Sequence, residues 1–189
     1  MGILPVYLFH KSDPAKKIKV YALLDNASGG TFVSEKSMEV LIPTTIHGTS
    51  CVTTKAVVGL VVANIKEENV ILDLPPTFTR HVTPADHNEI PRADIICNMS
   101  HLKKFGEEIS PYMADVEVGL LIGLNCPNAV RLREIVYGEY SDPYAVGSLL
   151  GWYINGPLRS QQQSSRITCD RIDLSLEDTL ITPRGYVVT

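Results

Sequence analysis

The sequence has few cysteines, and none of them is placed as metal sites usually require. The four are far apart and include no Cys-x-x-Cys pair: Cys51, Cys97, Cys126 and Cys169. We therefore expect reduced thiols in a cytoplasmic setting rather than a disulfide framework. His81 and His87 lie near Asp86 and Glu89, but no two histidines have the four-residue spacing of a helical zinc pair. We expect no metal and no other cofactor.

Long apolar runs and an excess of positive charge are also missing. No stretch approaches the 18 apolar residues of a membrane-spanning helix, and residues 3–9 lack the basic flank of a signal peptide. The formal net charge is -4, which gives no electrostatic basis for binding nucleic acid. We expect neither membrane insertion nor nucleic-acid binding.

Short apolar segments separated by turns predict a mainly β fold, built as a small closed barrel. We expect a hairpin turn at 11–17 and strands at 3–10, 18–24, 31–33, 52–62, 70–74, 116–123 and 128–136. Short helices are predicted at 34–41, with Ser34 as N-cap, and at 99–107. After Pro157 the composition becomes polar, with Ser-Gln-Gln-Gln-Ser-Ser at 160–165. This change predicts a domain over 1–157 and a linker or tail over 158–189.

The strongest functional signal is a carboxylate at the end of an apolar strand. The strand at 18–24 leads into Asp25, and small residues follow it: Asn26, Ala27, Ser28, Gly29 and Gly30. Aspartates that hydrolyse peptide bonds work in pairs around one water. Because two carboxyl groups this close together cannot both be ionised, the pair shares one proton. One member is then the base and the other the acid. An ordinary turn aspartate is the alternative interpretation.

The sequence contains only one loop of this kind. No second Asp is followed by Ser/Thr-Gly, and the nearest candidate, Asp178-Thr179-Leu180, lies beyond the linker. A single chain therefore lacks a pair of catalytic carboxylates. A two-fold homodimer supplies the pair, because a symmetric interface places Asp25 against Asp25 of its mate.

Several segments together resemble the aspartic peptidase region of Pao/BEL-type LTR retrotransposon polyproteins. They occur in the same order over about residues 3–157, at 20–25, 89–91, 101–102, 120–123, 130–131 and 151–156. The last, Gly-Trp-Tyr-Ile-Asn-Gly, is the most specific. The resemblance implies a retropepsin-like barrel in a retroelement particle. It also implies an aspartic-type endopeptidase that cleaves Gag-Pol as a homodimer and binds an extended peptide as an added strand.

The resemblance also implies roles for individual residues. Asp25 corresponds to the catalytic aspartate, oriented by Ser28, and the active-site loop continues through Asn26, Ala27 and Ser28. The supporting strand ends in Leu121, Ile122 and Gly123. Residues 52–62 correspond to the flap over the substrate. Gly48 and Gly59 are hinge candidates, although we prefer to interpret Gly59 as a plain turn glycine.

The loop departs from the family pattern at two positions. Active members read Asp-Ser/Thr-Gly-Ser/Ala, whereas Asn26 and Ala27 stand in the second and third positions here. The Cβ of Ala27 either crowds a partner loop or requires a negative φ. These departures favour the alternative function, a catalytically degenerate retropepsin-fold module for dimerisation or peptide binding. The segment at residues 75–117 is longer than a minimal viral peptidase needs. We expect it to form an elaboration beside the cleft.

Overall fold

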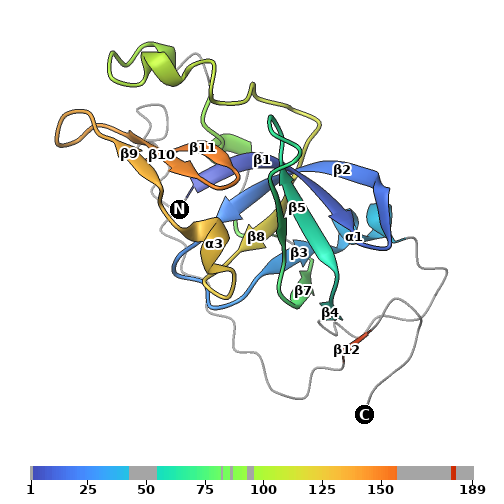
Figure 1. Ribbon diagram of the computed structural model, residues 1–189. Helices are drawn as coiled ribbons and strands as arrows, with labels where there is room; N and C mark the ends of the chain where they lie inside the picture. Colours follow the sequence, from blue (N-terminus) through green and yellow to red (C-terminus); the bar gives the residue numbers. More distant parts are fainter. Residues whose placement is uncertain are drawn as a thin grey trace.

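A computed structural model describes residues 2–42, 55–81, 83–85, 87–92, 96–156 and 180–181, and these residues form a mainly β fold (Figure 1). The predicted fold class is confirmed at this level. Two long strands, β1 (Gly2–His10) and β2 (Asp13–Leu24), open the chain. Shorter strands follow: β3 (Phe32–Ser34), β4 (Ala56–Val57), β5 (Leu60–Asn64), β6 (Ile71–Asp73), β7 (Thr77–Arg80), β8 (Val118–Ile122), β9 (Glu134–Val136), β10 (Tyr144–Ser148), β11 (Gly151–Asn155) and β12 (Leu180–Ile181).

Strands β1 and β2 form an antiparallel hairpin in which Gly2 pairs with Leu24 and Leu8 with Ile18. The pairing continues almost to the tip, where His10 lies opposite Asp13. The turn is therefore much shorter than the predicted 11–17. The first half of β2 is largely exposed, and its lysines lie over aromatic rings of β1: the Nζ of Lys17 is 5.7 Å from the ring centre of Phe9. Cation–aromatic contacts extend the hairpin beyond the apolar core.

Nine strands form one sheet in the order β12-β4-β7-β3-β8-β2-β1-β5-β6. Strand β8 lies between β2, to which it is parallel, and β3, to which it is antiparallel. It is the hydrogen-bonded connection between the two halves of the described sheet (Figure 1). All five residues of β8 are buried, as expected for a strand that is covered on both faces.

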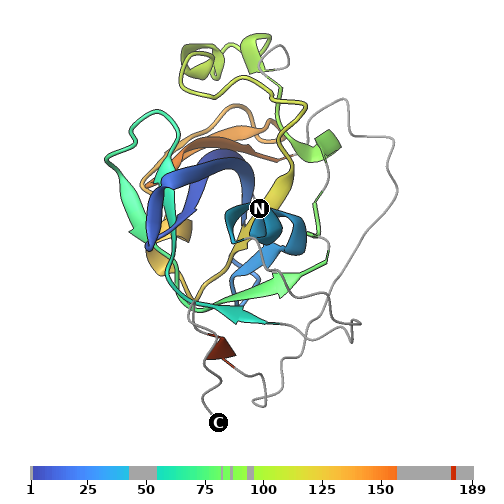
Figure 2. The ribbon, with the colours of Figure 1, turned by 90° about the vertical axis from the view of Figure 1, so that its right-hand side faces the viewer.

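The predicted closed barrel is wrong for the described strands. The sheet curls strongly (Figure 2), yet β6 and β12 are its two ends and do not pair with each other. Both end strands are only two or three residues long, which leaves few backbone groups for closure. The curled sheet encloses a core that includes Val6, Leu8 and Leu120.

A second sheet, in the order β11-β10-β9, packs on β1. The ring of Tyr153 in β11 lies so close to Gly2 that a Cβ there would stand 1.8 Å from the ring. Residues 96–109 cover the other side of this sheet, where the rings of Phe105 and Trp152 are 4.4 Å apart.

The helices are short. Helix α1 (Glu35–Leu41) begins after Ser34, whose Oγ accepts the N–H of Ser37 at 3.1 Å, so the predicted N-cap is confirmed. The predicted helix at 99–107 is wrong, because this stretch holds turns and a single 3-10 turn, η2 (Lys103–Phe105). The predicted strand at 128–136 begins as α3 (Pro127–Val130), with Pro127 at the helix start, and only then becomes β9. A further 3-10 turn, η1, spans His87–Glu89. Within the described residues, no helix combines the length and the apolar character needed to cross a membrane.

The predicted flap is not a separate hairpin in the part that the structure describes. Residues 60–62 belong to β5, an interior strand between β1 and β6 that is buried throughout. Gly59 separates β4 from β5 with a φ of 85°, so it acts as a turn glycine, as preferred. Residues 52–54 and Gly48 lie outside the described residues. From the predicted tail, β12 pairs in parallel with β4, while the boundary at Pro157 stays a prediction.

Candidate functional site

Asp25 lies at the end of β2, where the strand meets β8. Its backbone N–H donates to the carbonyl of Ile122 at 3.0 Å, which continues the β2–β8 pairing by one residue. Because side chains alternate along a strand, Asp25 shares a face of the sheet with Leu23 and Tyr21. Its side chain is half-buried, whereas Leu23 is fully buried. The fold therefore delivers one carboxylate to the rim of an apolar face.

The loop after Asp25 is held by its own backbone. The N–H of Ala27 donates to Oδ1 of Asp25 at 2.9 Å, and the N–H of Ser28 donates to the Asp25 carbonyl at 3.4 Å. The expectation that Ser28 orients Asp25 is wrong in this structure. The Ser28 hydroxyl donates to the Gly30 carbonyl at 2.9 Å instead. The Ala27 backbone fixes the carboxylate, and Ser28 fixes the far side of the loop.

Gly123 allows this loop to lie directly on β8. A Cβ at Gly123 would stand 2.2 Å from the Gly30 carbonyl oxygen and 2.7 Å from that of Ser28. The next residue, Leu124, donates its N–H to the Ser28 carbonyl at 2.8 Å. The structure thus brings together the two segments that the sequence singled out, the loop at 25–30 and the strand ending in Gly123.

Thr31 and Asn125 complete the support, although neither was predicted to have a role. Thr31 is fully buried, and its Oγ1 donates to Oδ1 of Asn125 at 2.7 Å and accepts the N–H of Gly123 at 3.3 Å. One hydroxyl therefore connects the end of the loop to the residues on both sides of Leu124. The one available sequence signal was an Asn two residues after the strand glycine.

The outer surface of the loop faces solvent. Asn26 and Ala27 are exposed, and Leu124 beside them is 52% exposed, although it is a large apolar residue. Among the described residues only glycines have a positive φ, so Ala27 is accommodated without left-handed backbone.

A second cluster anchors the beginning of β8. One carboxylate oxygen of Glu117 accepts the hydroxyls of Ser34 and Ser37 at 3.0 and 3.2 Å, and the other accepts Nζ of Lys36 at 2.7 Å. Burial raises the pKa of Glu117. The hydrogen bonds from the ammonium and the two hydroxyls, together with the ammonium charge, outweigh burial and lower the pKa overall. The carboxylate therefore ties α1 to the residue before β8.

This network predicts a loss of stability in acid. A carboxyl whose pKa is lower in the folded state stabilises the fold above its usual pKa of about 4.3, and the stabilisation disappears as the pH falls below it. We expect the difference in unfolding free energy between pH 7 and pH 3 to shrink by about 0.5–1 kcal/mol in Glu117→Gln, a modest value because the group is partly solvated. Urea unfolding at both pH values measures it. Glu39→Gln, on the exposed side of α1, should behave like the parent, and an equal effect in both variants would contradict this role.

The histidines have separate partners. His81 contacts Glu35 at 3.2 Å, His87 contacts the Tyr112 hydroxyl at 3.3 Å, and His101 contacts the Pro143 carbonyl at 2.8 Å. In the part of the chain that the structure describes, no three His, Cys, Asp or Glu side chains are grouped as metal ligands. Asp86 and His47 lie outside that part.

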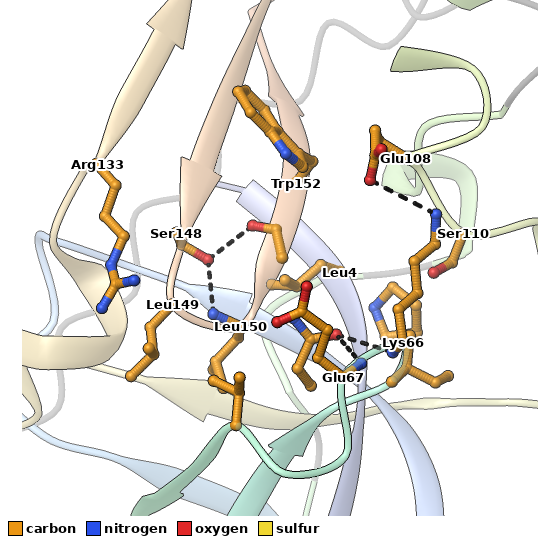
Figure 3. Close-up of a pocket in the computed structure, with 15 residues that line it drawn as sticks. Leu4, Lys66, Glu67, Glu108, Ser110, Arg133, Ser148, Leu149, Leu150 and Trp152 are labelled. Carbon is orange, nitrogen blue, oxygen red and sulfur yellow. Dashed lines mark hydrogen bonds and ion pairs between the residues drawn. The ribbon is translucent and has the colours of Figure 1, made fainter.

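A hollow of about 200 Å³ lies between the turn after β5 and the turn between β10 and β11 (Figure 3). Its charges balance, with Lys66 and Arg133 against Glu67 and Glu108, and Lys66 is 4.0 Å from Glu108. None of its lining residues belongs to the loop at 25–30 or to β8. The hollow is therefore separate from the Asp25 loop, and that loop remains the candidate site.

Comparisons with known protein families, with curated proteins and with solved structures found no match to this chain.

Proposed function

We propose that this chain is an aspartic-type endopeptidase of a Pao/BEL-type retrotransposon polyprotein, with a retropepsin-like fold, active as a homodimer. The observation that carries the proposal is the insertion of β8 between β2 and β3, with Gly123 against the loop that presents Asp25. This arrangement holds a single carboxylate at the rim of the sheet and leaves the loop surface free for a symmetric partner.

The chemistry requires a second carboxylate. Oδ1 of Asp25 accepts the Ala27 N–H, while Oδ2 has no hydrogen-bond donor among the described residues. In a two-fold dimer the two Asp25 carboxyls lie around one water and share a proton. One carboxyl takes a proton from the water as it attacks the peptide carbonyl, and the other protonates the substrate. An extended peptide lies across the dimer as an added strand.

The loop composition supports a second candidate function, a degenerate retropepsin-fold module that dimerises or binds peptides without cleaving them. Asn26 offers a longer polar side chain than the usual Ser or Thr, and the Ala27 methyl group stands on the exposed face of the loop. Both would lie at the contact between two loops. A displacement of about 1 Å there is enough to lower catalysis strongly.

Replacement of the carboxylate tests the first function. We expect the 189-residue chain to sediment as a dimer and to cleave unstructured peptides in a pepstatin-sensitive way. Asp25→Asn should lower kcat/KM at least 10³-fold without changing sedimentation, because the pair loses its acid–base function. Asp13→Asn is the matched control, since Asp13 is exposed at the opposite end of the same strand.

The outcomes separate the two functions. A dimer that cleaves only while Asp25 is present supports the peptidase. A dimer that binds peptides but cleaves nothing supports the degenerate module. Cleavage that persists in Asp25→Asn would refute the assignment of the catalytic residue.

A further inference from the structure

The face of the sheet that bears Asp25 is covered by other parts of the same chain. On this face lie Ile3, Leu23, Phe32 and Leu121, and none is more than 7% exposed. Leu23 precedes Asp25 by two residues and therefore lies about 7 Å along the strand from it. Leu121, in β8, pairs with Leu23 of β2. This apolar face leads directly to the candidate carboxylate.

The residues that cover this face come from the long stretch between β7 and β8. We call them the cover: Thr83, Ala85, Ile90, Tyr112, Met113 and Val116. Ile90 is buried within the cluster, and the four other apolar residues of the cover pack against it. No residue of the cover belongs to a strand. The cover therefore rests on the sheet without being part of its hydrogen-bonded ladder.

A few polar contacts hold the cover in place. The Thr83 hydroxyl donates to the Val118 carbonyl, and the Met113 N–H donates to the Tyr21 hydroxyl at 2.8 Å. Within the cover region, the ring of Tyr112 stands edge-on to the ring of His87, with the two ring centres 6.2 Å apart. The guanidinium carbon of Arg92 lies 4.8 Å from the centre of the Tyr112 ring. Tyr112 thus connects the part of the cover at residues 112–116 to the part at residues 83–92. Its side chain is only half-buried.

We propose that the cover is an intramolecular inhibitor of the Asp25 site, resting on the proposed peptidase function. An extended peptide bound at Asp25 places every second side chain on one side, about 7 Å apart. The neighbouring side chain would therefore meet Leu23 and Leu121, and the cover already occupies that place. Displacement of the cover exposes the face and admits the peptide, while the sheet that holds Asp25 stays intact.

The test measures access and cleavage separately. Leu23→Cys places a thiol beneath the cover. Two natural cysteines serve as references in the same chain, since Cys97 is exposed and Cys126 is buried in the opposite core. Tyr112→Ala loosens the cover, and Tyr140→Ala is the matched control because Tyr140 is fully exposed in the loop between β9 and β10. Labelling with a small maleimide is followed by peptide mapping.

We expect Tyr112→Ala to speed labelling of the introduced thiol at least tenfold while Cys126 stays protected, and to raise kcat/KM for peptides at least fivefold in the chain with Leu23 intact. Tyr140→Ala should change neither. Unchanged labelling, or labelling that rises only together with Cys126, would mean that these residues are ordinary core and would overturn the proposal. Faster labelling with unaltered cleavage in an active enzyme would also overturn it. Faster labelling in a chain that never cleaves would refute the peptidase function, and the inhibitory role with it, while showing that the cover can be displaced from the face.

Discussion

Gly123→Ala should lower the free energy of unfolding by about 3 kcal/mol and abolish any activity of the Asp25 loop. The added methyl group would stand 2.2 Å from one backbone carbonyl oxygen and 2.7 Å from another. Backbone atoms cannot rotate away as side chains do, so either the loop or β8 must move. Overpacking of this kind costs about 1–3 kcal/mol when side chains can adjust, and more when they cannot. Urea unfolding measures the loss.

The matched control is Gly29→Ala in the same loop. Nothing lies within 4 Å of a Cβ at Gly29, and its φ is not positive. We expect this variant to have the stability of the parent, or slightly more because alanine restricts the unfolded chain. Equal stability of Gly123→Ala and the parent would show that β8 does not hold the loop as closely as the structure indicates.

Thr31→Val should be the next most damaging change, with a loss of about 2–3 kcal/mol. Valine has nearly the same shape as threonine but neither donates to Asn125 nor accepts the Gly123 N–H, so a buried backbone donor stays unpaired. Thr31→Ser keeps the hydroxyl and loses only a methyl group, for which about 1 kcal/mol is expected. Thermal unfolding of the three proteins measures this order.

Thr79→Val provides the comparison for the hydroxyl. Thr79 is a half-buried residue of β7, and its Oγ1 accepts a single N–H, from Lys55, in a solvent-exposed hydrogen bond. Its loss should cost less than 1 kcal/mol, because water can replace the partner. If Thr31→Ser is less stable than Thr31→Val, packing of the methyl group rather than hydrogen bonding explains the role of Thr31.

Local chemistry made part of the fold predictable. The apolar residues before Asp25 gave the end of β2, and the serine before a run of helix-forming residues gave the N-cap of α1. Side-chain alternation and capping act over a few residues, so a single sequence contains them. The proximity of Gly123 to the loop came from a family resemblance, because no local pattern relates residues about a hundred positions apart.

The features that were missed depend on tertiary contacts. Thr31 and Asn125 are 94 residues apart, and the position of Asn125 two residues after Gly123 was the one sequence signal for either. The hydroxyl of Ser28 donates to the Gly30 carbonyl rather than to the Asp25 carboxylate, and only the folded loop shows this choice. Residues 99–107 have helical character, but the packing of Phe105 on Trp152 stabilises a turn-rich path instead. Among the described strands the predicted barrel does not close, because closure depends on the lengths of the strands at the two ends of the sheet.

The position of β8 also bears on how the chain is synthesised. Strands β1, β2, β5 and β6 form one half of the described sheet, and β3, β4 and β7 belong to the other. Within the described strands, these halves pair only through β8. Every one of these strands leaves the ribosome before β8 does. The nascent chain therefore carries two unpaired strand edges until residues 118–122 emerge, and contacts of such long sequence separation form slowly. Asp25 is synthesised early, but β8, the strand that supports its loop, follows about a hundred residues later. The loop therefore acquires its shape only after most of the domain has been translated.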